Sequence, residues 1–304
     1  MTELREEAVP QAQAAPQPAS AAGDRGWYLY GITRRGAVGT IRPERGDGDH
    51  GAAESASAPG GDEDEPLQVL DCGALAAIVR RVPLAQFSEE ALRAHGDDTA
   101  WIAEMARRHN QVIAAIHQQQ AILPAKFGSV YARAEDVQAA VAGAHDALLA
   151  QLERVEGCDE WAVHVYADRA AIEQRVVAAH PTIQALQQEI VAASPGRAYL
   201  LQRKLGEERA ATTDQALREM AQAHYEQLAR GAVAGQLTQP TRSAPAAHDE
   251  IEVLRAAFLV QRASADTFLA ELRSCVESRE GVHCEYSGPW PPYSFAVPAE
   301  EEPP

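Results

Sequence analysis

Hydrophobic residues along the chain follow two spacings, and the two-residue spacing marks the predicted strands. Strands are predicted for the aromatic run WYLYGI and for the runs LQVLDCG and LAAIVRRV, which pair across Gly73. A further strand is predicted for WAVHVYA, with Val163 and Val165 on one side. Because Pro124 cannot donate a ladder hydrogen bond, AILPAKFGSVY is expected to be an edge strand or a loop. Two more strands are predicted for VLRAAFLVQ and VHCEYS.

Other stretches repeat hydrophobic residues every three or four positions, which is the spacing of an amphipathic helix. One such stripe follows two aspartates and consists of Ile102, Met105, His109, Val112, Ile113 and Ile116. A helix is also predicted to begin at Ser88, a suitable N-cap followed by two glutamates. Two further helices are predicted, from Ala134 to Leu152 and from Asp266 to Glu280.

Two longer stripes in the second half of the chain predict a helical hairpin. The first keeps heptad spacing through Ile172, Val176, Ala179, Ile183, Leu186 and Ile190. Pro181 lies within this stripe and is expected to kink the helix or restart it. The second stripe contains Leu217, Met220, His224 and Leu228, and we expect it to pack antiparallel against the first.

Stretches of small and polar residues divide the chain into domains. Residues 1–25 and 298–304 are predicted to be tails, and residues 36–66 an acidic insertion. Residues 1–25 and 36–66 are too poor in large apolar groups to offset the entropy of ordering, so we expect disorder in these two stretches. The remainder forms an N-terminal domain at 26–168 and a C-terminal domain at 169–297. The order of strands and helices predicts an α+β fold with two α+β domains.

The charge of the chain limits its partners. A formal net charge of −17 argues against nucleic acid and against anionic membranes, since both attract clustered positive charge. The sequence contains no apolar run of about eighteen residues that could span a bilayer. The acidic start lacks the apolar segment of a secretory signal, and we expect a cytoplasmic protein.

Catalytic and metal-binding patterns are weak in this sequence. It contains no glycine-rich phosphate loop, no GxSxG elbow and no HExxH, and we expect no enzyme activity and no cofactor. The four cysteines form no CxxC pair, and neighbours such as His283 and Cys284 point to opposite faces of a strand, so no metal site is expected. The alternative hypothesis is an enzyme or metal-dependent regulator that uses His283, Cys284 and Cys275.

The stretch GPWPPYSF near the C-terminus combines three prolines with three aromatic residues. Proline fixes φ and removes a hydrogen-bond donor, so we expect an extended, polyproline-like path outside the middle of a sheet. At about three residues per turn, Trp290 and Tyr293 would face the same way. We predict that Trp290 mainly fills the core. The alternative interpretation is a surface that grips a partner.

Five motifs, in order, resemble the gas vesicle protein L/F family. They are LYGI, ILPAKFGSV, GRAYLLQRK, AAFLVQR and GPWPPYSFA, and the resemblance covers roughly residues 27–297. Ala125 and Lys126 stand where the family more often has a bulkier residue and an arginine, and the insertion at 36–66 also departs from the compact family core.

The resemblance implies a non-enzymatic accessory or minor structural protein of the gas vesicle, the organelle that gives cells buoyancy. It further implies a ferredoxin-like N-terminal domain and a C-terminal α+β domain with a coiled coil. The expected partners are the small hydrophobic shell protein and other accessory proteins, in the cytoplasm and at the gas vesicle. The candidate partner-binding residues lie inside the motifs and are Trp290, Tyr293, Phe295, Phe127, Arg197 and Tyr199.

Overall fold

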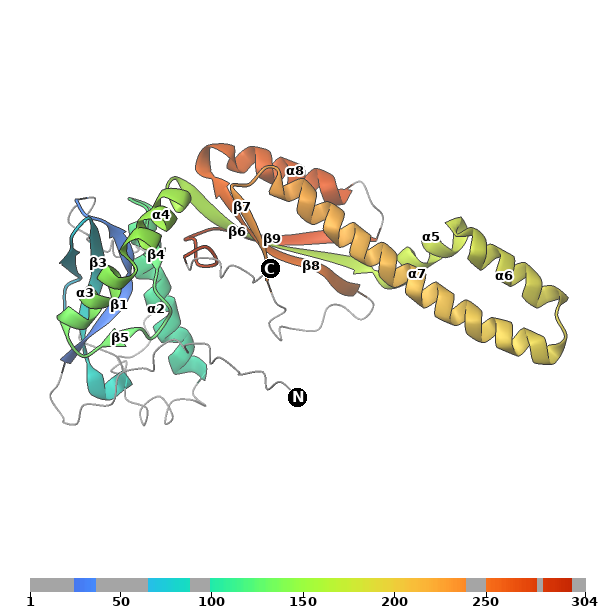
Figure 1. The fold of residues 1–304 in the computed structure, drawn as a ribbon, viewed down its shortest axis with the longest axis horizontal. Helices are drawn as coiled ribbons and strands as arrows, with labels where there is room; N and C mark the ends of the chain where they lie inside the picture. The colour runs from blue at the N-terminus through green and yellow to red at the C-terminus, as the bar shows by residue number, and fades with distance from the viewer. Residues whose placement is uncertain (1–24, 37–64, 88–98, 239–249, 278–280, 297–304) are drawn as a thin grey trace, which may run out of the picture. The chain divides into compact units, whose positions relative to one another are not determined.

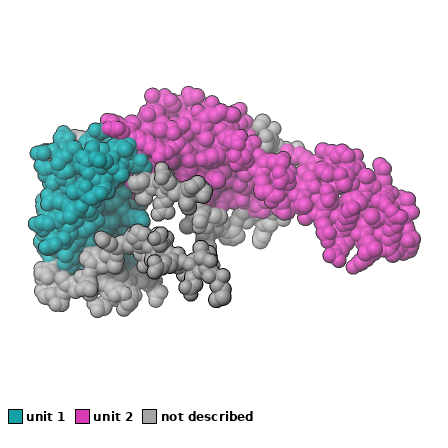
Figure 2. All heavy atoms as spheres, viewed as in Figure 1, with its two compact units in different colours: residues 1–152 teal, residues 153–304 magenta. Residues whose placement is uncertain are grey.

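The computed structural model describes residues 25–36, 65–87, 99–238, 250–277 and 281–296. The chain divides into two compact units, Met1–Leu152 and Glu153–Pro304, which are coloured separately in Figure 2. Almost all of the predicted tails and insertion, together with the predicted N-cap at Ser88, lie outside the described residues.

Unit 1 is built on an antiparallel sheet with the strand order β2-β3-β1-β4 (Figure 1). Its strands confirm the predicted pairing around Gly73 and are β1 (Arg25–Arg34), β2 (Gln68–Cys72), β3 (Leu75–Pro83), β4 (Leu123–Pro124) and β5 (Val130–Tyr131). The short strands β4 and β5 both pair with β1, so the stretch around Pro124 lies at the sheet edge, as its proline predicts.

The helices of unit 1 begin after β3. They are the 3₁₀ turn η1 (Leu84–Phe87), α2 (Thr99–His117), α3 (Ala134–Gly143) and α4 (His145–Val155), whose end passes into unit 2. The single helix predicted from Ala134 to Leu152 is therefore wrong. Ala144 leaves the helical region with φ −115° and ψ 17°, and its N–H turns back to the carbonyls of Ala142 and Val141. This tight turn after Gly143 separates the two helices.

Unit 2 contains a second antiparallel sheet with the order β7-β8-β6-β9. The strands are β6 (Cys158–Asp168), β7 (Ala234–Leu237), β8 (Glu250–Gln261) and β9 (Val282–Trp290). The sequence placed the domain boundary after Asp168, whereas the two units divide after Leu152. The boundary lies earlier because β6 pairs with β8 on one side and with β9 on the other, which makes it a central strand of unit 2.

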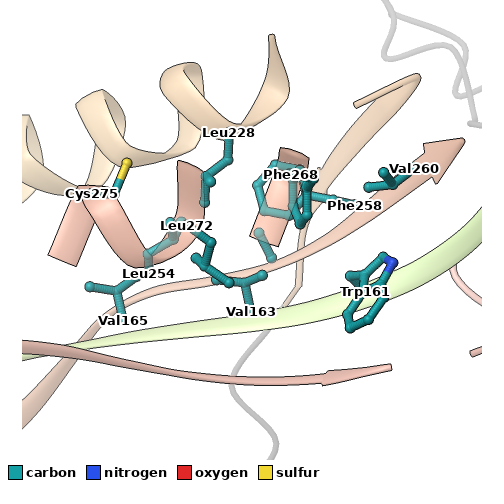
Figure 3. Close-up of a cluster of buried hydrophobic side chains, with 11 residues drawn as sticks. Trp161, Val163, Val165, Leu228, Leu254, Phe258, Val260, Phe268, Leu272 and Cys275 are labelled. Atoms are coloured by element: carbon teal, nitrogen blue, oxygen red, sulfur yellow. The ribbon is translucent and has the colours of Figure 1, made fainter. Parts of the chain in front are cut away.

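The core of unit 2 lies between this sheet and two helices, α7 (Pro195–Ala229) and α8 (Ala265–Glu277), the second preceded by η2 (Arg262–Ser264). Figure 3 shows Leu228 of α7 and Phe268 and Leu272 of α8 facing the strands. Val163 and Val165 point from β6 into the same cluster, which confirms that they share one side. The helices α7 and α8 therefore cover the face of the sheet that carries Val163 and Val165.

The predicted helical hairpin is present in unit 2. Its first arm consists of α5 (Arg169–Ala179) and α6 (Pro181–Ala192), and Pro181 restarts the helix as predicted. The Asp168 carboxylate caps α5 by accepting the N–H of Ala171 at 3.0 Å. The second arm is α7, which packs on both α5 and α6 and whose C-terminal half reaches the sheet (Figure 1). The buried stripe on α7 includes Leu217, Met220, His224 and Leu228.

The two sheets share one arrangement of strands. In each unit the first strand lies between the third and the fourth, and the third lies between the first and the second. Unit 2 reads β-α-β-β-α-β along the chain when α5, α6 and α7 are counted as one helical connection. Among the helices of the described ranges, none is long and apolar enough to cross a membrane.

Candidate binding surface at the C-terminal segment

The C-terminal segment, residues 288–296, begins with the last three residues of the edge strand β9. Gly288 lies so close to β6 that a Cβ atom there would stand 2.8 Å from Cε3 of Trp161 and 2.9 Å from the Glu160 carbonyl oxygen. Its φ of +149° also falls in a region that favours glycine. The peptide bond from Gly288 to Pro289 is cis. Glycine is therefore required at position 288, where β9 passes close to Trp161 and Glu160 of β6.

Beyond Trp290 the segment folds back on itself. The N–H of Tyr293 donates to the carbonyl of Pro291 at 2.8 Å, and the N–H of Phe295 donates to the carbonyl of Pro292 at 3.2 Å. The predicted polyproline-like path is therefore wrong, because Pro289 lies within strand β9 and the residues after Trp290 form tight turns. The expectation that the prolines stay out of the middle of a sheet is confirmed, since β9 is an edge strand.

The structure corrects the prediction that Trp290 fills the core. The Trp290 side chain is 48% exposed, and its Nε1–H donates to Oγ of Ser287 at 3.1 Å. Pro291, Pro292 and Phe295 are buried instead and anchor the segment. Trp290 is left outside because it occupies the last position of the edge strand, opposite Glu160, where no strand follows to cover it.

A buried carboxyl group ties this segment to β6. Glu160 accepts two hydrogen bonds from Ser294, one from the backbone N–H and one from the hydroxyl, each 2.7 Å long. Burial raises the pKa of Glu160 above its usual value, and the two hydrogen bonds oppose that rise. Half-buried Tyr293 lies nearby, and burial, followed by the repulsion of the Glu160 carboxylate, raises the pKa of its phenol to about 12. The backbone around Trp290 is thus fixed before it by the pairing of β9 with β6, and after it by the hydrogen bonds from Ser294 to Glu160.

Phe127, the candidate in unit 1, lies on a short loop that is clamped to β1. The N–H of Ala125 donates to the carbonyl of Tyr30, and the N–H of Leu29 donates to the carbonyl of Ser129. The Phe127 ring is exposed at the end of this loop and meets the His109 ring edge-on, at a centroid distance of 5.8 Å.

His109 and Tyr28 form the support beneath that loop. The Tyr28 hydroxyl lies 2.9 Å from His109 Nδ1 and accepts the N–H of Gly128 at 3.1 Å. Burial lowers the pKa of His109, and a hydrogen bond to the carbonyl of Ala125 opposes this effect. Burial also raises the pKa of Tyr28. Both rings therefore stay uncharged near neutral pH, and both contact the loop, Tyr28 at Gly128 and His109 at Phe127.

Arg197 and Tyr199 lie in the first turns of α7, beside the turn that joins it to α6. Arg197 pairs with Glu189 across that turn, and both side chains are exposed. The hairpin leaves the sheet where β6 ends at Asp168, whereas the C-terminal segment binds β6 at Glu160. These positions are eight residues apart, about 26 Å along a strand. The structure therefore does not bring all the candidate residues together.

The alternative site built on His283, Cys284 and Cys275 is not assembled. His283 stacks on Tyr166 and approaches Glu250 at 3.2 Å, whereas Cys284 packs against the hydrophobic core where Cys275 is buried. The expectation that His283 and Cys284 point to opposite faces is thus confirmed. Within the described ranges no group of three His, Cys, Asp or Glu side chains could hold a metal ion.

Sequence reasoning missed the residues that position the segment. Glu160 lies on a strand among alternating polar residues, which is the pattern of a solvent-exposed face. It is buried instead by contact with the segment around Ser294, which is distant in the sequence. Gly288 carried a signal, because a glycine beside a proline marks a special backbone conformation. His109 appeared in an apolar helical stripe, and its burial there agrees with that pattern.

Comparisons with known proteins agree with the motifs. The model of the family described as "Gas vesicle synthesis protein GvpL/GvpF" matches residues 26–297. Gas vesicle protein L of Streptomyces sp. (strain CB03234) is 34% identical over 280 residues, covering 92% of this chain and 96% of that protein. Gas vesicle protein F of the same strain is 30% identical over 268 residues, covering 88% and 98%.

The fold is also similar to a solved structure. The crystal structure of the gas vesicle protein GvpF from Anabaena sp. PCC7120 superposes with a TM-score of 0.62, covering 91% of this chain and all of that one. At 16% sequence identity, this similarity concerns the fold.

Proposed function

This chain belongs to the gas vesicle synthesis protein GvpL/GvpF family, and on that premise we propose that it is a non-enzymatic factor that binds the hydrophobic shell protein during gas vesicle nucleation and assembly. Other accessory proteins of the same assembly would be its further partners. It would act in the cytoplasm and at the gas vesicle, without binding nucleic acid or a membrane.

The observation that carries the proposal is the exposed Trp290 on an anchored segment. An exposed indole whose backbone is already fixed loses little conformational entropy on binding, and tryptophan is the side chain most enriched among interface hot spots. The anchors are the buried Phe295 and the two hydrogen bonds from Ser294 to Glu160. Tyr293 stands beside them, half-buried, and would line the rim of the contact.

The charge of the chain supplies a mechanism for assisting assembly. A shell protein exposes apolar surface before it is incorporated, and such surfaces aggregate. A partner with a net charge of −17 would make each complex repel the next, which keeps the shell protein soluble until it is transferred.

Two details of the fold are part of the proposal. We assign a ferredoxin-like arrangement to the N-terminal unit, and the support for it is the strand order that its sheet shares with that of unit 2. We also assign coiled-coil packing to the hairpin, supported by the four- and three-residue spacing of the buried residues on α7.

The test is a binding titration of the shell protein with the full chain and with the variant Trp290→Ala. Loss of a hot-spot tryptophan should weaken binding by about 30-fold, the equivalent of roughly 2 kcal/mol. The melting temperature should stay nearly unchanged, because Trp290 is half exposed and the segment keeps its other anchors.

The matched control is Leu237→Ala, which removes an exposed hydrophobic side chain from β7, the opposite edge strand of the same sheet. This control should bind the shell protein like the unmodified chain. Equal binding by the Trp290→Ala variant would show that the C-terminal segment is not the contact.

A further inference from the structure

The most exposed hydrophobic side chains of the described residues gather at the turn between α6 and α7. Val191 is 87% exposed, Tyr199 70% and Leu200 65%. Single exposed hydrophobic residues are common on protein surfaces. Here, however, three such residues lie within a stretch of ten residues around one turn and form a cluster. Together with the cations Arg203 and Lys204 on α7, they are called the hairpin tip below.

The helical periodicity of α7 shows that these side chains do not serve the hairpin itself. The positions of α7 that turn toward the inside of the hairpin are half-buried and are occupied by Ala198, Leu201 and Leu205. Tyr199 and Leu200 fall outside that stripe and are exposed. Each has a cation four residues later on the same side of the helix, Arg203 after Tyr199 and Lys204 after Leu200. The exposed face is therefore apolar at one end and cationic at the other.

The charge of the hairpin tip is opposite to that of the protein. Residues 189–204 contain three cations and one anion, a net of +2, in a chain of net −17, and the next charged residues along α7 are Glu207 and Glu208. The three cations of this stretch are Arg197, Arg203 and Lys204. Arg197 pairs with Glu189 and Arg203 pairs with Glu207, but all four side chains are exposed, and such pairs contribute little to stability. These cations therefore remain available to an anionic partner.

The hairpin tip also stands apart from the rest of unit 2. Thr213, the first buried residue of α7, lies fourteen residues beyond Tyr199, which corresponds to about 21 Å of helix. A rigid helix thus carries the tip away from the sheet, and in Figure 1 the turn between α6 and α7 lies at the far end of the hairpin. This location is separate from the C-terminal segment, which binds β6 at Glu160.

We propose that the hairpin tip docks an amphipathic helix of a partner protein, one whose apolar stripe is flanked by Asp and Glu. The apolar stripe would cover Val191, Tyr199 and Leu200, and the carboxylates would pair with Arg203 and Lys204. The complementary charge selects an acidic occupant, whereas a tip-to-tip contact with a second copy of this chain would place the same cations opposite one another. The partner helix would extend the α6–α7 pair to a local three-helix bundle.

This inference rests on the proposed function only in taking the protein to be an assembly factor with more than one partner. The probe is a fluorescent model peptide of about three heptads, with leucine at the a and d positions and glutamate at e and g. A matched peptide carries lysine instead of glutamate. Anisotropy titrations with the full chain should give binding of the acidic peptide, weakened by added salt, and much weaker binding of the lysine peptide.

Two variants locate the contact. Tyr199→Ala with Leu200→Ala, and Arg203→Glu with Lys204→Glu, should each weaken binding of the acidic peptide by at least about tenfold. Both pairs are exposed, so circular dichroism and melting temperature should not change. Trp290→Ala should bind the peptide normally, which separates this result from the test with the shell protein.

Four results would overturn the proposal. One is equal binding of the acidic and lysine peptides, and another is unchanged peptide binding by both double variants. The third is a concentration-dependent dimer that dissociates on Leu200→Glu in analytical ultracentrifugation, because the occupant would then be a second copy of this chain. Cosedimentation with phosphatidylserine vesicles that is lost in the same variant would instead assign the tip to anionic lipid and would also overturn it.

Discussion

Glu160 shows how one residue couples the C-terminal segment to pH. Because burial raises the pKa of its carboxyl, the folded protein holds a proton at pH values where the unfolded chain has lost it. Glu160 therefore favours folding most below its ordinary pKa, and this contribution is lost as the pH rises through the raised pKa. The hydrogen bonds from Ser294 limit that loss by favouring the ionised form.

We predict that the variant Glu160→Gln gains stability relative to the unmodified chain as the pH rises from about 4 to about 7, since an amide does not ionise. The amide keeps an acceptor oxygen for Ser294. The variant Ser294→Ala should have the opposite effect, a steeper loss of stability over the same range, because one donor to the carboxylate is missing. Urea unfolding at several pH values measures both. Parallel pH profiles for all three proteins would contradict the assignment of Glu160.

At single residues, the sequence predicted side-chain direction better than burial. Val163 and Val165 share one side of β6, and His283 and Cys284 point apart, because alternation in a strand is a local property. The exposure of Trp290 could not be predicted in the same way. It depends on β9 being the edge of the sheet, and that is decided by pairing between strands far apart in the sequence.

At the scale of elements, α7 has a buried end and an exposed end. Its C-terminal half carries Leu228, which is fully buried against the sheet, and its N-terminal turns carry the exposed Leu200. We predict that Leu228→Ala destabilises the protein by about 2–5 kcal/mol through loss of buried area and a residual cavity. The chemically identical change Leu200→Ala should cost less than about 0.5 kcal/mol. Thermal melts of the two variants, followed by circular dichroism, make the comparison, and similar shifts would contradict the division of α7.

Most elements were predictable because their periodicity is local. The paired strands around Gly73, the restart at Pro181 and the stripe on α7 follow from spacing and from the properties of proline. The break at Ala144 was missed because alanine and glycine between two amphipathic stretches of the same period carry no strong stop signal. The full length of β9 was also missed, since Pro289 disguises the end of an edge strand.

At the scale of the whole molecule, the C-terminal segment and the hairpin tip lie at different ends of unit 2 and differ in chemistry. One presents an exposed indole at the end of the edge strand β9, and the other presents apolar and cationic side chains on a helix. Two such surfaces on one rigid unit would allow a shell protein and a second, acidic partner to be held together. The strong negative charge of the remainder would keep this complex dispersed.

The most direct test of the proposed assembly function is the solubility of the shell protein. Light scattering should follow its aggregation after dilution from denaturant, with an equal molar amount of this protein or of an unrelated acidic protein of similar charge. We predict that this protein suppresses the scattering, that Trp290→Ala largely loses the effect, and that the unrelated acidic protein has none. Scattering that is the same with and without this protein, together with no detectable binding, would contradict its role as a shell-protein-binding assembly factor.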